Sequence, residues 1–435
     1  MSKKPTPLAM YERVLVGILL VIFAGIVIHA PLSVWLGTVF GDQTLLIKSW
    51  KELLMAPALV LLAVSLTRRQ AWGMYRSQLF MMIGAYAALH LALLPFFAFQ
   101  LEPVLAGLLI NLRFLLFFVL MYGVVSLFPQ LRRLFLWAFF GGVIAVVGFA
   151  TLQVTVLPHD ILRHIGYGES TIMPYLTVDQ NYDFVRINST LRGPNSVGAY
   201  VIIVLAAALA YLLAFWKRLS TIWRTVLLMF MALSTVALWF SYSRSAVIGA
   251  LAAVGLVFAT RYAQYATRIS KWVWLGLVVA VLALVGGVYA LRDTSFVSNV
   301  ILHEDPNEGN NVNSNDGHWS SLVHGTERML AQPFGAGVGS TGSASLLGDS
   351  PNIIENYYLF VAHETGWLGL ALFVGVFVGV MRRLWARRGD WLALAIFASG
   401  VGLALVGVLL PVWVDDTVAI IWWGLAGVVL YRHKR

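Results

Sequence analysis

The chain has 435 residues, of which 60% are hydrophobic and only 11% are charged, whereas a soluble domain carries roughly 25% charged residues. This composition excludes a soluble enzyme with a single anchor and indicates a protein that crosses a membrane many times. Cysteine is absent, which excludes disulfides, thiolate catalysis and cysteine-bound metal.

Apolar runs along the chain predict an all-α polytopic membrane protein with a large, partly helical external loop. Crossing the hydrocarbon core needs about 20 apolar residues, and the second, eighth and twelfth runs are short by this measure. The first run follows Lys3 and Lys4 but has no small-residue cleavage site after it, so it is expected to be a retained helix. The twelve predicted spans are 14–30, 53–66, 79–98, 104–128, 134–157, 197–216, 225–240, 245–260, 272–290, 357–380, 391–411 and 418–431.

Basic residues predict the orientation of these spans. With the N-terminus inside, 21 of the 30 Lys and Arg residues fall on the inner side, but only Glu12 and Asp390 of the 20 acidic residues do. This asymmetry follows the positive-inside rule, so both termini are expected in the cytoplasm. The net charge of +10 is then a topology signal, and no nucleic acid partner is expected because the cations are spread over short turns. The predicted segments are transmembrane helices 1–5 (1–157), an external loop (158–196), helices 6–9 (197–290), a large external loop (291–356), and helices 10–12 with a cytoplasmic tail (357–435).

Residues Leu291–Asn356 form the longest polar segment outside the membrane. They hold eight carboxylates, three histidines and only two fixed cations, Arg292 and Arg328. Long loops of this kind usually carry function. Any chemistry here faces the exterior, where ATP and nucleotide sugars are absent.

Nine cations do not fit the inside pattern. Lys48 and Lys51 are interpreted as anchors of a helix end at the membrane interface. Arg113 lies about nine residues into the fourth predicted span, where a charge costs at least ~2.5 kcal/mol unless it is paired or hydrated. It is therefore either functional or paired with a buried carboxylate such as Glu364.

Three further arginines lie at the outer ends of predicted spans. Arg186 and Arg192 precede the sixth span, and Arg244 lies where the seventh span turns into the eighth. Pro194 and Asn195 are interpreted as the turn and N-cap of the sixth span, whose free N–H groups favour an anion. Guanidinium groups match phosphate oxygens bidentately, so a pyrophosphate is the expected ligand.

The large external loop contains two recognisable patterns. Residues 316–332 have helical spacing of apolar side chains, which predicts an amphipathic helix lying on the outer face. The glycine-rich stretch 333–342 lacks the strand–helix context of a dinucleotide fingerprint and indicates a flexible or tightly turned loop. Glu355 and Asn356 then open the tenth span, where a carboxylate also complements the helix dipole.

Taken in order, these segments resemble the O-antigen ligase / O-antigen polymerase superfamily of bacterial membrane glycosyltransferases. The resemblance covers residues 186 to 369. It rests on Arg186 with Asn195 nine positions later, on Ser243-Arg244, and on the glycine-rich loop. The fourth element is Asn356 followed by Glu364-Thr365-Gly366 and Gly369.

The resemblance implies an inverting glycosyl transfer that needs no metal or other cofactor, at the outer face of the bacterial inner membrane. The donor would be an undecaprenyl-diphosphate-linked glycan, the acceptor a glycan or the lipid A core, and the surroundings membrane lipids. Arg186 and Arg244 match the positions that hold the donor diphosphate, and Arg192 and Arg113 are added as candidates on their position in the chain. Accessory candidates are His324, Arg328, Asn356 and Glu364.

Two positions depart from the pattern of the ligases. His318 replaces an arginine that ligases commonly carry fifteen residues before the loop proline, and Glu355 replaces a histidine that is the proposed base or acceptor-orienting group of the ligases. A glutamate can also accept the proton of an attacking hydroxyl, so His318 and Glu355 are the catalytic candidates. The departures favour a surface polysaccharide polymerase. A ligase, a protein O-glycosyltransferase and, from another class, a lipid-linked glycan transporter or flippase are the alternatives.

Overall fold

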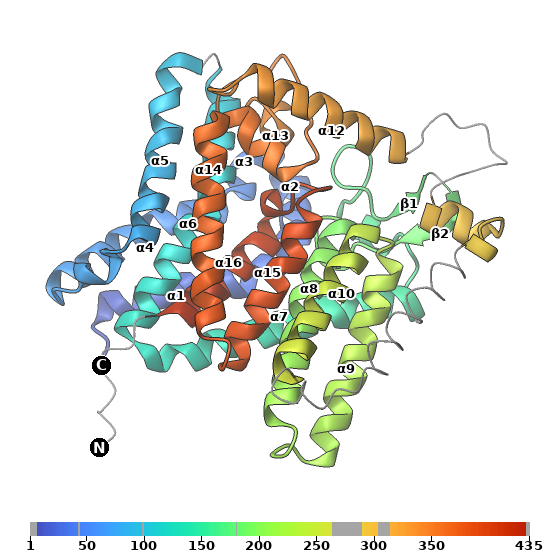
Figure 1. Cartoon of the computed structure of the whole chain (residues 1–435), viewed down its shortest axis with the longest axis horizontal. Coiled ribbons are helices and arrows are strands. Elements are labelled where there is room, and N and C mark those ends of the chain that lie inside the picture. The colour runs from blue at the N-terminus through green and yellow to red at the C-terminus, as the bar shows by residue number, and fades with distance from the viewer. Residues whose placement is uncertain are drawn as a thin grey trace.

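The computed structural model describes residues 7–41, 44–97, 100–179, 181–262, 289–302 and 314–431. They form a bundle of apolar helices crossed at one end by α12 (Figure 1). Between them lie one hairpin and several short 3-10 turns. The first half comprises α1 (Met10–Gly25), α2 (His29–Phe40), α3 (Thr44–Lys48), α4 (Trp50–Arg68), η3 (Trp72–Tyr75), α5 (Gln78–Phe97), α6 (Leu101–Leu127) and α7 (Arg132–Thr155). The second half comprises β1 (Leu176–Val178), β2 (Asn181–Arg186), α8 (Pro194–Phe215), α9 (Thr221–Phe240), α10 (Arg244–Tyr262), η7 (Val297–Leu302), α12 (Ser314–Ala331), α13 (Gly342–Ser345), α14 (Tyr357–Ala386), α15 (Trp391–Val406) and α16 (Asp416–Leu430).

The prediction of an all-α membrane protein is confirmed. Among the described residues, nine helical stretches are long and apolar enough to cross a membrane, and α15 and α16 are shorter apolar helices. Together they overlap eleven of the twelve predicted spans, while the predicted span 272–290 lies almost wholly outside the described residues. The first stretch is longer than expected and runs over Met10–Phe40. The antiparallel pair of β1 and β2 was not predicted.

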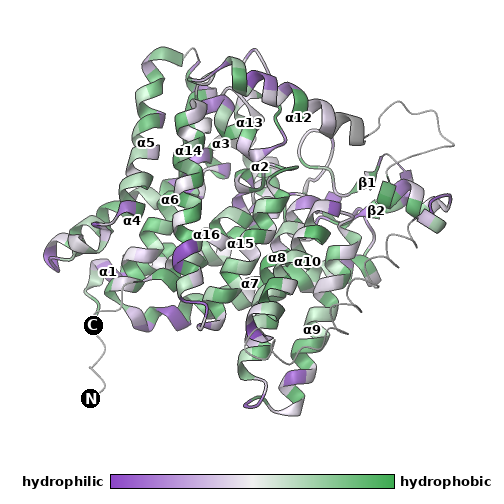
Figure 2. Ribbon diagram, in the orientation of Figure 1, coloured by the Kyte–Doolittle hydropathy of each residue, from purple (hydrophilic) through white to green (hydrophobic). Residues whose placement is uncertain are grey.

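The core lies where α16 packs against α6. Every residue of α16 after Asp416 is buried, and two of its glycines allow the backbones to approach closely. A Cβ at Gly427 would lie 2.9 Å from the carbonyl oxygen of Phe118, and one at Gly424 would lie 2.8 Å from the Phe117 ring. Small residues at such contacts are typical of helix packing in membranes. Hydrophobic residues predominate along α5, α9 and α10 (Figure 2), and exposed ones among them include Met81 in α5, Met229 in α9 and Leu251 in α10.

The two acidic residues predicted to lie inside both pair with arginines predicted to lie there. Arg69 binds Glu12 with Nε–Oε1 at 2.6 Å, and Arg132 binds Asp390 at 2.6 Å. Figure 1 shows α12 along the opposite end of the bundle from the turn that joins α8 and α9. The two ends of the bundle can therefore be told apart by the elements that they carry, with α12 at one end and the turn between α8 and α9 at the other.

Candidate functional site

Arg186 is the last residue of β2 and links three elements. Its Nε donates to the carbonyl oxygen of Ser241 at 2.9 Å, beyond the end of α9, and its Nη2 donates to Asn195 Oδ1 at 2.7 Å, in the first turn of α8. The pairing of Leu176 with Arg186 ends the hairpin and fixes the position of this side chain. Hairpin and helix ends thus hold one guanidinium in a defined orientation.

Arg244 begins α10 and lies close to Arg186. Its Nη1 donates to the carbonyl oxygen of Ile301 in η7 at 3.1 Å. Burial and the nearby charge of Arg244 lower the pKa of Arg186 to about 10, although the carboxylate of Asp179 acts in the opposite direction. Asp179 lies near both arginines and offsets part of their mutual repulsion. Two guanidinium groups that face one carboxylate keep a net positive charge, so the arrangement suits a phosphate or diphosphate.

The start of α8 differs in detail from the prediction. Gly193 is the N-cap and Pro194 is the first helical residue, so the prediction that Asn195 caps the helix is wrong. Asn195 uses its side chain to hold Arg186 instead. Arg192 is exposed just before this turn. Arg192 is therefore close in the chain to the end of α8 that Asn195 ties to Arg186.

Helix α14 is interrupted at Gly366, and the glycine-rich loop fills the break. Gly366 has φ 68° and ψ −170°, a combination open essentially only to glycine. The break leaves the carbonyls of His363 and Glu364 without helical partners. They accept hydrogen bonds from the backbone N–H groups of Ala336 at 2.6 Å and Gly337 at 3.2 Å. The sequence predicted either a flexible or a tightly turned loop, and the structure shows a tightly turned one.

Glu364 holds the same loop from inside the bundle. Its buried carboxylate accepts hydrogen bonds from the N–H of Gly339 at 3.0 Å and that of Thr341 at 3.4 Å, and from the side chain of Asn111. All three donors are neutral. Glu364 therefore anchors the loop. The predicted pairing of Arg113 with a buried carboxylate does occur, but its partners are Glu52 and Asp416 and not Glu364.

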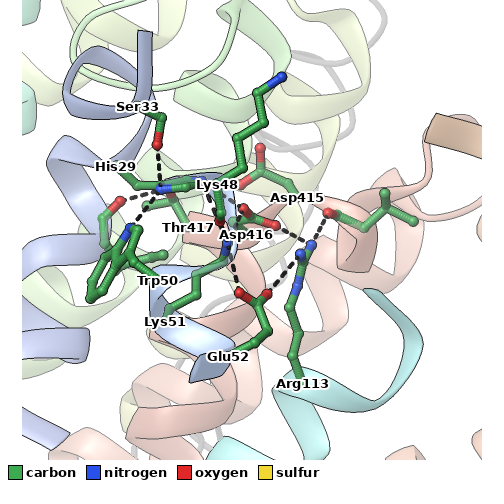
Figure 3. A network of polar contacts seen from close by, with 12 residues as sticks. His29, Ser33, Lys48, Trp50, Lys51, Glu52, Arg113, Asp415, Asp416 and Thr417 are labelled. Atoms are coloured by element: carbon green, nitrogen blue, oxygen red, sulfur yellow. Dashed lines mark hydrogen bonds and ion pairs between the residues drawn. The ribbon is translucent and has the colours of Figure 1, made fainter. Parts of the chain in front are cut away.

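Arg113 instead belongs to a buried network of charges (Figure 3). It pairs with Asp416 and, at 3.4 Å, with Glu52, and it donates to the carbonyl oxygen of Val414. Asp416 also pairs with Lys51 Nζ at 2.9 Å and with His29 Nε2 at 2.9 Å. The two fixed cations, Arg113 and Lys51, are thus both paired with the carboxylates of Asp416 and Glu52.

This network corrects one prediction, and its carboxylates Glu52 and Asp416 were not identified from the sequence. Lys51 is only 2% exposed, so its interpretation as an interface anchor is wrong. Asp415-Asp416, directly before an apolar run, could have indicated this network from the sequence. Two adjacent carboxylates at the end of a membrane span need cations nearby. Asp415 caps α16 by accepting from the N–H of Val418, and it also accepts from Ser196 Oγ in α8.

Glu355, a catalytic candidate, precedes the start of α14 and is half-buried. Asn356 caps the helix, with its Oδ1 accepting from the N–H groups of Tyr358 and Leu359 at 2.9 Å. Asn356 Nδ2 donates to the carbonyl oxygen of Val408 at 2.8 Å, beyond the end of α15. The accessory candidate Asn356 is therefore an anchor that fixes where Glu355 lies.

The predicted amphipathic helix is present as α12. Leu322 and Met329 pack against the core, whereas Trp319 and Leu330 are exposed. His318 lies in the first half of α12, and its side chain lies outside the described part of the chain. The end of α12 that carries it is the end nearer the β1–β2 hairpin (Figure 1).

The other end of α12 is tied to α14. Arg328 Nη1 donates to the side chain of Asn352, whose Nδ2 is 3.3 Å from His363 Nε2. Trp367 Nε1 donates to the carbonyl oxygen of Met329 at 2.7 Å. His324 is exposed and pairs with the neighbouring Glu327 at 3.2 Å. Arg328 thus holds α12 in place across the end of the bundle.

The segment between α15 and α16 connects the two halves of this site. At its start, Val408 holds Asn356 next to Glu355. At its end, Asp415 holds Ser196, whose neighbour Asn195 holds Arg186. The structure therefore brings the start of α14 and the arginine pair to the same end of the bundle. Among the described residues, no three His, Asp or Glu side chains gather as metal ligands.

The fold and site define a polytopic membrane protein with paired arginines and a helical cover at one end. A family model described as O-antigen ligase matches residues 229–374, which include Arg244, the glycine-rich loop and Glu355. No curated protein matches the chain. The match supports the resemblance to the O-antigen ligase / polymerase superfamily and indicates a membrane glycosyltransferase of that type. The matched region begins after Arg186 and ends within α14.

Proposed function

We propose that the protein is a polymerase that joins lipid-linked glycan units at the outer face of the bacterial inner membrane. The observation that carries the proposal is the arginine pair, in which Arg186 and Arg244 come from different elements and lie close together in a partly buried site. Departure of a lipid diphosphate develops negative charge, and fixed guanidinium groups stabilise that charge best where water is scarce. Undecaprenyl diphosphate is the proposed leaving group, and Arg192 is a third donor-binding candidate at the same helix end.

Glu355 is proposed as the base. A hydroxyl oxygen of the acceptor forms the new bond to the anomeric carbon while the bond from that carbon to the diphosphate oxygen breaks. The hydroxyl proton passes to the Glu355 carboxylate, and the bonding electrons leave with the diphosphate. Attack opposite the leaving group inverts the anomeric configuration. His318 and His324, both on α12, would lie on the acceptor side, and no step in this scheme needs a metal.

Arg113 has a different place in the proposal. Its described contacts are carboxylates and a carbonyl oxygen within the bundle. A guanidinium already matched by Asp416 and Glu52 has less charge to offer a diphosphate. We therefore propose that Arg113 supports the site by holding α6 against α16, rather than by binding the donor.

A ligase is the second candidate, and the matched family's own description favours it. It would transfer the finished glycan to the lipid A core or to another acceptor. Deleting the gene and separating the surface glycan on a gel distinguishes the two. Loss of the long ladder, with single units retained on lipid A, supports a polymerase. Loss of all glycan on lipid A, with long chains left on the lipid carrier, supports a ligase, and an unchanged glycan contradicts both.

The arginine pair is tested by Arg244→Ala. The variant is expected to reach the membrane in normal amount but to assemble no glycan. Arg292→Ala is the matched control, because Arg292 is also predicted to be an external arginine. Its side chain is 52% exposed, and its contact with Asp293 is a long one of 3.7 Å. Near-normal glycan with Arg244→Ala, or equal loss in both variants, would overturn the proposed role of the pair.

A further inference from the structure

A cleft of about 350 Å³ lies at the other end of the bundle from α12. It is bordered by the connection from η3 to α5, by α6, and by the last turn of α14. The position of the cleft follows from helix α5. The helix starts at Gln78, beside the cleft, and its last residue, Phe97, packs against Gly337 of the glycine-rich loop. A helix of 20 residues is about 30 Å long. The cleft is therefore about one membrane thickness away from the proposed glycosyl-transfer site.

Three arginines and no acidic residue line this cleft: Arg76, Arg383 and Arg387. Arg383 Nη2 donates to Ser77 Oγ at 3.1 Å, and Arg387 Nη1 donates to the carbonyl oxygens of Val429 at 2.6 Å and Tyr431 at 3.0 Å. These partners are neutral, so they orient the guanidinium groups without cancelling the charge. A guanidinium has five N–H donors, so each group can also bind an anion.

An apolar groove of about 120 Å³ adjoins the same short helix. It is lined by Leu59, Leu62, Ala63, Leu66, Trp72, Tyr75 and Val119. The η3 segment contributes Trp72 and Tyr75 to the groove, and Gly73 and Met74 to the basic cleft. Trp72 is 48% exposed, as expected for a tryptophan at the membrane interface. A ligand that suits both hollows has an anionic head beside long apolar chains.

We propose that the basic cleft binds the phosphate headgroup of an anionic phospholipid from the adjacent leaflet. Guanidinium groups hold phosphate oxygens bidentately, and basic pockets at the cytoplasmic ends of transmembrane helices suit such headgroups. A soluble phosphate would use the arginines but not the groove. The proposal depends on the membrane-spanning fold and not on the glycosyl-transfer reaction, so the two can fail separately.

The test measures lipid binding directly. Protein purified in mild detergent is titrated with phosphatidylglycerol, and the fraction with one bound lipid is measured by native mass spectrometry. Arg76→Gln/Arg387→Gln is expected to bind at least about tenfold more weakly, because each arginine contributes appreciably to binding anionic lipid. The matched control is Arg382→Gln/Arg388→Gln, two exposed arginines of the same region that do not line the cleft. Its affinity should remain near that of the unchanged protein.

Each other result contradicts the proposal. Equal loss in both double variants would mean general attraction to a basic surface. Equal binding of phosphatidylcholine would mean that net charge is irrelevant. Displacement of the lipid by an equal concentration of glycerol phosphate would mean that the cleft binds a free phosphate. If Arg76→Gln/Arg387→Gln fails to fold, Arg76→Gln alone, a change at an exposed position, must still weaken binding.

Discussion

Replacing Arg113 by methionine tests whether this arginine supports the fold or binds the donor. Its side chain is 6% exposed, and its partners Asp416 and Glu52 are 22% and 8% exposed. Without Arg113, Lys51 would be the one fixed cation of this network, 2.9 Å from Asp416 and 3.3 Å from Glu52. His29 would remain beside Asp416, but two carboxylates would then face one fixed cation. Breaking a buried pair in this way costs about 3–5 kcal/mol.

The same reasoning predicts a rescue. Arg113→Met/Glu52→Gln removes one cation and one anion, and it leaves Lys51 paired with Asp416. The double variant should regain most of the stability that the single variant loses, because replacing both partners of a buried pair is often close to neutral. Arg292→Met is the control, since an exposed pair contributes only about 0–1 kcal/mol.

Stability is measured as the temperature at which a fluorescent fusion of the protein loses its monodisperse peak in detergent. A change of 1 kcal/mol corresponds to ~2 °C in a large chain, so Arg113→Met should lose several degrees. The reasoning is refuted if Arg113→Met unfolds at the normal temperature, or if adding Glu52→Gln makes it worse. If the double variant is stable but assembles no glycan, Arg113 would instead be a residue that binds the donor.

The remaining predictions concern α14, the base and the donor arginine. Gly366→Ala should lose at least ~3 kcal/mol, because a Cβ there would lie 2.3 Å from the carbonyl oxygen of Pro333 and strained backbone adds to the clash. Gly148→Ala, in an open helical position, should gain up to ~1 kcal/mol in the same thermal assay. Glu355→Gln should remove the glycan ladder while Glu355→His retains part of it, and a full ladder with Glu355→Gln would exclude the base. Arg186 loses its charge only as pH rises through about 10, so retention of a lipid diphosphate analogue should be constant from about pH 6 to 9; a decline centred near pH 7 would contradict this. Glycan assembly should also survive chelators, and a strict requirement for a divalent ion would contradict a metal-free reaction.

The membrane architecture could be predicted because it depends on local composition. A run of about 20 apolar residues has few alternatives to a membrane-spanning helix. The helix over 316–332 was visible for a similar reason, since its apolar side chains repeat at helical spacing. The hairpin of β1 and β2 was harder to predict, because β1 has only three residues and the polar–apolar alternation of β2 extends only over Asn181–Phe184.

The site could be predicted only in part, because its parts depend on contacts between distant segments. Arg186 and Arg244 stood out as isolated cations at helix ends, but their closeness depends on how β2 meets the end of α9. Glu364 was visible as a buried carboxylate, yet its partners are backbone N–H groups that a sequence pattern does not identify.

The glycine-rich loop shows why this limit matters for function. Its glycines resemble a ligand-binding loop, but two of its N–H groups bind carbonyls freed by the break in α14 and two others bind Glu364. The break at Gly366 and the loop therefore require each other, and together they fix the outer half of α14. That half begins at Tyr357, two residues after Glu355. A change in the loop should thus move the proposed base relative to the arginine pair without touching either substrate.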